Sequence, residues 1–196
     1  AQASVAPSTA APSTGAASST APTEAPPASP VMADAITMYT PGGAAPNFDP
    51  AQASVNQYNF LAPVYDPLLR RMSDGPFEPR RATAWSYTSP TELVLKIRDG
   101  VTFSDGTPLD AAAVVKNMDN VKKGTGSYAA QFASMSAITA TDPSTVTITL
   151  SQPNPSLPVL FSSAAGMIAS PAALGTDGLA TTPVGSGPYA YDAQAS

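Results

Sequence analysis

The strongest candidates for chemistry in this sequence are three neighbouring carboxylates, Asp99, Asp105 and Asp110. Paired carboxylates can act as general acid and base, and clustered carboxylates can bind calcium. Their spacing does not follow the Asp-x-Asp-x-Asp-Gly pattern of a calcium loop. Asp99 and Asp105 each precede a glycine, as in tight turns, and Asp110 falls at the start of a predicted helix. We therefore favour structural roles for all three over catalysis or metal binding.

Other groups that enzymes commonly use are missing. The 196 residues include no Cys and no His, which removes the thiol nucleophile, the imidazole base and the usual zinc ligands. Gly185 and Gly187 have the first spacing of a dinucleotide-binding loop, but the third glycine and the helix that should follow are absent. The sequence therefore predicts a protein that is not an enzyme and has no cofactor or bound metal.

The charge distribution bears on the choice of partner. The formal net charge is −5, which argues against nucleic acid as the main partner. All nine basic residues lie between Arg70 and Lys123, where acidic residues are interspersed, so we interpret them as a solvated mixed face. No apolar run approaches the ~20 residues of a membrane-spanning helix.

The central part of the chain has a clear pattern of strand and turns. Three apolar residues alternate with Glu92, Lys96 and Arg98, which is typical of a half-buried strand. The apolar positions are Leu93, Leu95 and Ile97. Asp99-Gly100 suits a two-residue hairpin, beyond which Val101 and Phe103 resume the strand pattern. Asp105-Gly106 predicts a second turn.

A helix is predicted directly after the second turn. Thr107 can cap it, with Pro108 in the first helical position and Asp110 in the first turn. Gly124 is a plausible end. The apolar stripe that should face the core comprises Val114, Val115, Met118 and Val121.

Other elements are indicated on both sides of this region. Residues 55–70 predict a helix interrupted at Pro63, and residues 128–135 predict a short helix. Residues 145–150 alternate Thr with Val, Ile and Leu, which predicts a strand with one wet face. The single tryptophan, Trp85, precedes a predicted strand, and we favour a packing role for it over ligand stacking.

Several motifs resemble one protein family. Arg98–Phe103, Asp105–Leu109 and the Val114-Val115 pair match the signature region of the family 5 extracellular solute-binding proteins, the oligopeptide- and dipeptide-binding components of ABC importers. Further elements resemble the family in the same order along the chain, namely Phe48-Asp49-Pro50, Tyr65–Leu69, Phe77–Trp85 and Val184–Tyr189.

The resemblance implies a fold and a domain organisation. We expect a mixed α/β chain that forms the N-terminal part of a two-lobed, class II periplasmic-binding-protein-like fold. Residues 34–68, beginning with a strand at 36–40, would form the first segment of lobe I, and 69–155 a smaller α/β subdomain. Residues 156–196 would return to lobe I. Because proteins of this family are considerably longer, the chain resembles an N-terminal fragment that lacks the second large lobe.

The resemblance also implies a function and a site. We expect a substrate-binding component of an ABC-type importer that captures extracellular peptides or a similar small solute for a membrane permease. Ser54, Val55 and Asn56 correspond to residues that line the cleft in some members, and Tyr128 to a tyrosine that faces the ligand. The alternatives are an ordinary loop and a packing tyrosine. No acid occurs at 54–56, which argues against recognition of a peptide amine there.

The first residues differ sharply in composition from the rest. Residues 1–30 contain ten Ala, ten Ser or Thr and six Pro, with Glu24 as the only charge. Such a segment buries too little apolar surface to offset the entropy of ordering it, so residues 1–33 are predicted to be a disordered linker. The family context favours a stalk between a lipidated N-terminus and a domain outside the cell membrane or in the periplasm, with a signal peptide already removed. The alternative function is a cell-surface interaction protein on this stalk.

Overall fold

The computed structural model describes residues 47–192. The chain divides into two units, Ala1–Thr37 and Met38–Ser196, and every described residue belongs to the second. The predicted linker at 1–33 and the predicted strand at 36–40 lie outside the described residues. Within 47–192, none of the helices combines the length and the apolar character needed to cross a membrane.

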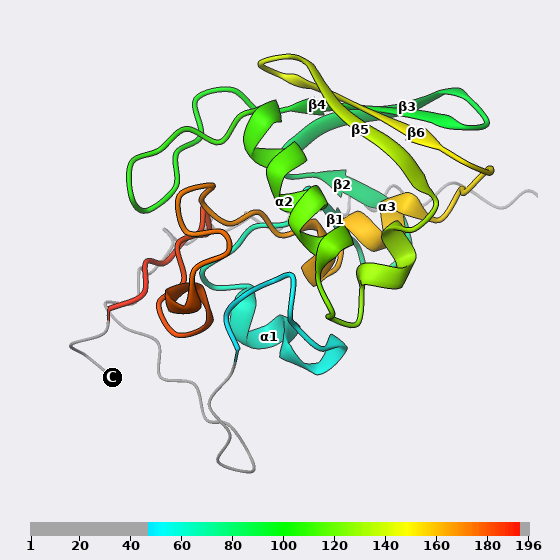
Figure 1. The fold of residues 1–196 in the computed structure, drawn as a ribbon. Helices are drawn as coiled ribbons and strands as arrows, with labels where there is room; N and C mark the ends of the chain where they lie inside the picture. The colour runs from blue at the N-terminus through cyan, green and yellow to red at the C-terminus, as the bar shows by residue number, and fades with distance from the viewer. Residues whose placement is uncertain (1–46, 193–196) are drawn as a thin grey trace, which may run out of the picture. The chain divides into compact units, whose positions relative to one another are not determined.

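A four-stranded antiparallel sheet organises this unit (Figure 1). Its strands are β3 (Ala82–Ser89), β4 (Glu92–Ile97), β6 (Thr145–Leu150) and β5 (Met135–Asp142), in that spatial order. Leu93 pairs with Ile148 and Leu95 with Val146, and all four side chains are buried. The alternation of apolar and polar residues thus sets the register, because a shift by one residue would expose these side chains.

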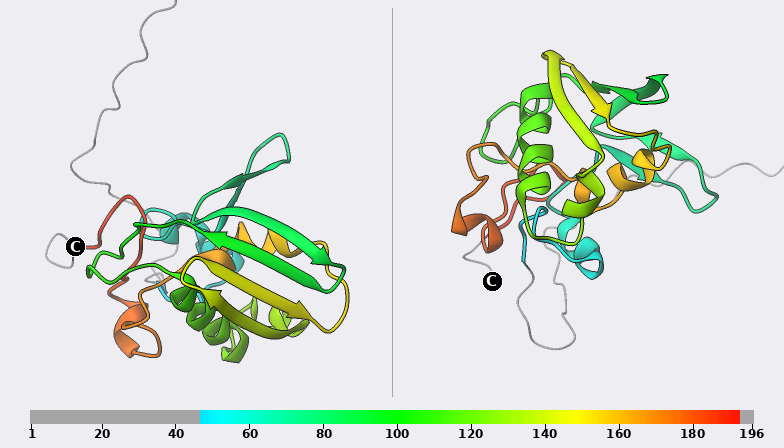
Figure 2. Two further views of the ribbon diagram at one scale, coloured as in Figure 1. Left: turned by 90° about the horizontal axis from the view of Figure 1, so that it is seen from above. Right: turned by 45° about the vertical axis from the view of Figure 1, so that its right-hand side comes forward.

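Helix α2 (Ala111–Lys123) packs against β5 and β6 on one face of the sheet (Figure 2). Its buried residues include Val114, Met118 and Val121 of the predicted stripe, whereas Val115 is only half-buried. Asn117 on the same face is also buried, and its side chain joins the helix to the backbone of Ala169. The helix is therefore fixed both by apolar burial and by a buried polar contact.

The remaining elements are short. Strands β1 (Leu69–Arg71) and β2 (Phe77–Pro79) form a hairpin, with Gly75 at a φ of 108° in its turn. The short helices are η1 (Val55–Gln57), α1 (Tyr58–Leu61), η2 (Ala129–Phe132), α3 (Leu157–Phe161), η3 (Ala164–Gly166) and η4 (Asp177–Ala180). Tyr65, Phe132 and Phe161 are the bulkiest fully buried side chains of the core that these elements share.

Segments distant in the sequence lie side by side in this unit. The N–H of Leu68 donates to Gly166 O at 2.9 Å, and the N–H of Gly187 donates to Val64 O at 2.7 Å. Gly185 passes so close to Val64 that a Cβ at this position would collide with the Val64 carbonyl. The Val-Gly-Ser-Gly-Pro-Tyr element thus needs its first glycine for a close backbone approach.

The start of α2 differs from the prediction. The helix begins at Ala111, and Asp110 rather than Thr107 is the N-cap, with its carboxylate accepting from the Ala113 N–H at 2.8 Å. The Thr107 hydroxyl instead donates to Asp105 Oδ1 at 2.6 Å. An isolated antiparallel bridge between Thr102 and Pro108 closes the turn at Asp105-Gly106, and Pro108 is therefore not helical. The turn at Asp105 therefore uses the threonine that was expected to cap the helix.

The long helix expected over 55–70 is also wrong. Only η1 and α1 form, and the helix ends at Leu61, just before Ala62-Pro63. Proline lacks an N–H and its ring clashes with the preceding turn, so it stops the helix here rather than interrupting it. Asp66-Pro67 keeps the next residues extended, and Leu69–Arg71 becomes β1.

The predicted hairpin is wrong, although a turn forms at its expected position. A turn forms at Asp99-Gly100 and Gly100 has a φ of 72°, but Asp99 has no positive φ, so the turn is not the predicted two-residue hairpin turn. Val101 and Phe103 do not pair with β4, whose two edges are occupied by β3 and β6.

The strand predicted at 145–150 is confirmed, as is the packing role of Trp85, which is half-buried against the core. Residues 128–135 form only the four-residue η2, and β5 begins at Met135.

Candidate functional site

The segment that contains Ser54, Val55 and Asn56 is fixed by local hydrogen bonds. Ser54 is the N-cap of η1; its N–H donates to Gln57 Oε1 at 3.0 Å, and the Gln57 N–H donates to Ser54 O at 3.0 Å. Ser54 is half-buried and Asn56 is exposed. Asn56 therefore has an amide that is available to a ligand, whereas the Ser54 backbone is already occupied.

The turn before this segment contains a partly buried carboxylate. Asp49 Oδ1 accepts from the Ala51 N–H at 2.9 Å, and the Asp49 N–H donates to Asn47 Oδ1 at 2.9 Å. Burial raises the pKa of Asp49, and the hydrogen bond from Ala51 opposes the rise. The Phe48-Asp49-Pro50 motif thus acts here as a turn that positions the chain entering η1.

Tyr128 lies at the N-cap of η2 and only 6% of it is exposed, so its ring belongs to the hydrophobic core of the described residues. The loop before it meets the turn before Ser54. Gly126 approaches Ala51 so closely that no Cβ fits, and the Thr125 hydroxyl donates to Gln52 Oε1 at 3.2 Å. The structure therefore brings together the two loops that precede the predicted site residues, with Asn56 exposed and Tyr128 packed inside.

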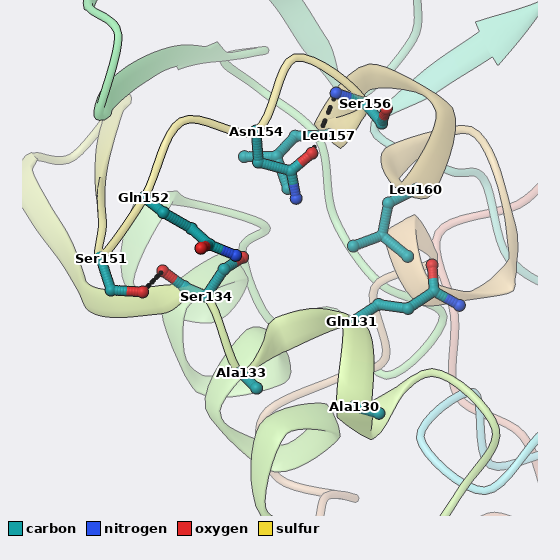
Figure 3. Close-up of a pocket in the computed structure, with 10 residues that line it drawn as sticks. All are labelled: Ala130, Gln131, Ala133, Ser134, Ser151, Gln152, Asn154, Ser156, Leu157 and Leu160. Carbon is teal, nitrogen blue, oxygen red and sulfur yellow. Dashed lines mark hydrogen bonds between the residues drawn. The ribbon is translucent and has the colours of Figure 1, made fainter.

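A hollow of about 480 Å³ lies between the η2 segment and the loop that leads into α3 (Figure 3). Its lining side chains are amides, hydroxyls and small or apolar groups, with no charged residue: Ala130, Gln131, Ala133, Ser134, Ser151, Gln152, Asn154, Ser156, Leu157 and Leu160. Some of the polar groups pair with one another. Asn154 Oδ1 accepts from the Ser156 N–H at 3.0 Å, and the Ser151 hydroxyl donates to Ser134 O at 3.3 Å.

This hollow can bind a solute through hydrogen bonds from uncharged groups. Free amide groups can donate to and accept from peptide bonds or hydroxyl groups, and leucine side chains can contact apolar parts of a solute. General acid–base catalysis would need a titratable group, which this lining lacks. These residues could not be recognised from the sequence, because they come from two segments, 130–134 and 151–160, that have no motif of their own.

The three carboxylates considered for catalysis or metal binding have structural surroundings. Asp105 accepts from the Thr107 N–H at 2.9 Å and from the Ser170 hydroxyl at 2.5 Å. Its pKa is lowered, because these bonds and the Thr107 hydroxyl outweigh the opposing effect of burial. Asp110 caps α2, and Asp99 lies in the Gly100 turn. No cluster of three His, Cys, Asp or Glu that could hold a metal occurs within residues 47–192.

Two sequence comparisons identify relatives. Residues 76–194 match the family described as bacterial extracellular solute-binding proteins, family 5, middle part. The glutathione-binding protein GsiB of Escherichia coli K12 is 34% identical over 120 residues, which are 58% of this chain and 23% of that protein. The chain thus spans about a quarter of the length of the glutathione-binding relatives it matches.

Solved structures share the fold. OppA of Burkholderia pseudomallei aligns with a TM-score of 0.66 and 22% identity, over 73% of this chain and 33% of that one. NikZ of Campylobacter jejuni, solved with Ni(L-His), aligns with a TM-score of 0.67 and 24% identity, over 74% and 30%. An ABC transporter substrate-binding protein of Sinorhizobium meliloti aligns with a TM-score of 0.64 and 28% identity, over 74% and 31%.

These similarities confirm the predicted mixed α/β fold of the class II periplasmic-binding-protein type, and the resemblance inferred from the motifs. They do not test the domain boundaries 34–68, 69–155 and 156–196, nor the roles of Ser54, Val55, Asn56 and Tyr128, which stay predictions. The match to the family covers more than half of the residues. The chain belongs to the bacterial extracellular solute-binding proteins of family 5.

Proposed function

We propose that this chain is part of the substrate-binding component of an ABC-type importer, which captures a peptide or a similar small solute outside the cell and delivers it to a membrane permease. The observation that supports this most strongly is the family match over residues 76–194, combined with the fold of solved binding proteins. The relatives are solute-binding proteins rather than enzymes, and a non-catalytic role agrees with the structural surroundings of the three aspartates.

The relatives suggest the class of solute. GsiB is named for glutathione, NikZ was solved with Ni(L-His), and MppA is described as a murein tripeptide-binding protein. These solutes are short peptides or contain amino acids. We propose a solute of the same kind, with amide and carboxylate groups that accept and donate hydrogen bonds.

The proposed cleft lies at Ser54, Val55, Asn56 and Tyr128. Because only 6% of Tyr128 is exposed, its ring packs in the core and contributes little surface to the cleft. Two facts support this position: the loops before Ser54 and Tyr128 are in contact, and the Asn56 amide is exposed. We place the opposing lobe in the part of the relatives that this chain does not span. Closure of that lobe would bury the solute and exclude water, which strengthens the few polar contacts that orient it.

The domain plan and the location follow from the same proposal. Residues 34–68 and 156–196 would belong to lobe I, and residues 69–155 would form the smaller subdomain. The protein would work in the periplasm or on the outer side of the cell membrane, where its relatives act. A lipidated N-terminus reached through the linker at 1–33 would tether it near the permease, and mass spectrometry of the native N-terminus tests this part separately.

Uptake of labelled solutes tests the function in cells. Wild-type cells and cells that lack the gene are compared for accumulation of glutathione, di- and tripeptides and nickel–histidine. We expect the deletion to abolish high-affinity uptake of one solute class and reintroduction of the gene to restore it. Unchanged uptake of every class, together with the absence of permease and ATPase genes beside this gene, would favour the alternative of a cell-surface interaction protein.

The proposed cleft is tested by Asn56→Ala in the whole protein. Loss of one amide hydrogen bond to the solute weakens binding by about 3- to 12-fold. Asn59→Ala is the matched control, because Asn59 is exposed on the neighbouring helix α1 but is not a predicted cleft residue. Equal affinities of the two variants for the solute would contradict the assignment of Asn56 to the cleft.

A further inference from the structure

A second hollow, of about 450 Å³, is lined by charged groups rather than neutral ones. It shares no residue with the neutral hollow beside η2. The side chains that matter here are Tyr58, Asp66, Arg70, Arg80 and Arg81. Three arginines and one aspartate give its wall a formal charge of +2, whereas the whole chain has a net charge of −5.

One of the three arginines is already neutralised. Arg81 Nη2 lies 3.2 Å from Asp66 Oδ2 and also donates to Ser186 O. Burial lowers the pKa of Arg81, and the attraction of Asp66 opposes this effect. The ion pair connects the residue before β3 to the segment between α1 and β1, and the hydrogen bond to Ser186 O reaches the segment before Tyr189. We regard both as structural contacts that form one wall of the hollow.

The other two arginines form no ion pair with any described residue. Within residues 47–192 the one ion pair is Arg81–Asp66, and Asp66 is the only carboxylate that lines the hollow, so the wall keeps an excess of positive charge. Glu78 lies opposite Arg70 on β2 but forms no ion pair with it. Arg98 does not line the hollow, but its Nε donates to Arg80 O at 2.9 Å and its positive charge contributes to lowering the pKa of Arg81. Like charges held together repel one another, and a bound anion relieves that repulsion.

The available donors fit an oxyanion. A guanidinium presents a planar fork of N–H groups that matches a carboxylate or a phosphate. The Tyr58 ring is half-buried in the same lining and supplies a hydroxyl donor. The volume falls within the range of about 300 to 1,000 Å³ that is usual for small-molecule sites.

We propose that this arginine-lined hollow, formed by Tyr58, Arg70, Arg80 and the Arg81–Asp66 pair, is a binding site for a small multivalent oxyanion with phosphate or carboxylate groups. The site is separate from the proposed solute cleft and does not depend on the transport function. The interpretation of the basic residues as a solvated mixed face is thereby modified for Arg70, Arg80 and Arg81, which line one hollow.

Isothermal titration of the protein with inorganic phosphate and with citrate, at constant ionic strength set by sodium chloride, tests the proposal. We expect saturable binding of at least one of them to one site. Removal of both guanidiniums in Arg70→Gln/Arg80→Gln should weaken binding at least about 100-fold, since each charged hydrogen bond contributes about tenfold or more. Arg70→Gln alone should weaken it about tenfold, and serves if the double variant does not fold.

Arg71→Gln is the matched control, because it removes the same charge from the same strand β1 at a residue that does not line the hollow. It should bind like the wild type. Absence of binding of both anions at millimolar concentration would overturn the proposal. Anion binding weakened equally by Arg71→Gln would also overturn it, because it would indicate diffuse charge attraction. Binding of a polyglutamate peptide without any binding of phosphate or citrate would overturn it as well.

Discussion

Replacing Asn117 with alanine should destabilise the described unit more than any other single loss of a polar side chain in α2. The Asn117 amide nitrogen donates to Ala169 O at 2.8 Å, and its oxygen accepts from the Ala169 N–H at 2.8 Å. Asn117 is 5% exposed and Ala169 is fully buried. The substitution therefore leaves two backbone groups without their partner inside the core.

The magnitude follows from these two groups. A buried donor or acceptor left unsatisfied costs about 1–3 kcal/mol, so the loss of both should lower the free energy of unfolding by about 2–6 kcal/mol. Alanine has a higher helix propensity than asparagine, which offsets up to about 0.7 kcal/mol of the loss in the free energy of unfolding. Asn117→Leu, which keeps the volume and excludes water from the space, should cost at least as much.

Urea unfolding followed by circular dichroism measures the effect. Asn120→Ala is the control, because Asn120 is half-buried on the same helix and gains the same helix propensity. We expect a change below about 1 kcal/mol for this variant. If Asn117→Ala costs no more than Asn120→Ala, the buried amide does not fix α2 to the backbone at Ala169, and the reasoning is refuted.

Two further predictions concern backbone packing and acid stability. Gly185→Ala should lower the free energy of unfolding by more than about 2 kcal/mol, because the added Cβ would collide with Val64 O. At Gly178 an added Cβ meets no close contact, so Gly178→Ala should change the free energy of unfolding by less than about 0.5 kcal/mol, as measured by thermal unfolding. Asp105 has a lowered pKa in the folded state, so it should stabilise the protein above its unfolded value of about 3.9 and lose this effect as the pH falls through the folded value. Asp105→Asn should make the free energy of unfolding depend less steeply on pH below about pH 4. A steeper fall of the free energy of unfolding with acid in the variant would contradict this.

Much of the fold could be predicted where burial alone decides the structure. The alternation around Leu95 and the strand at 145–150 reflect one buried face, and their register follows from it. Prediction failed where two local hydrogen bonds compete. Both Thr107 and Asp110 can cap a helix, and the outcome depends on Asp105, which takes the threonine hydroxyl.

The strand β5 is absent from the sequence prediction for a different reason. Its sequence is rich in Thr and Ala, and few of its residues are buried, so pairing with β6 stabilises it more than its own pattern indicates. The two hollows could not be predicted at all. Each collects side chains from segments far apart in the chain, such as Arg70 and Pro188, and only the folded backbone brings these together.

Solute binding by the whole protein that contains this chain is the most direct test of the central claim. Isothermal titration against a panel of short peptides, glutathione, sugars and nickel–histidine should reveal saturable, one-to-one binding of one solute class. Asn56→Ala should weaken that binding. If correctly folded protein binds no member of the panel, capture of a peptide-like solute for import is contradicted.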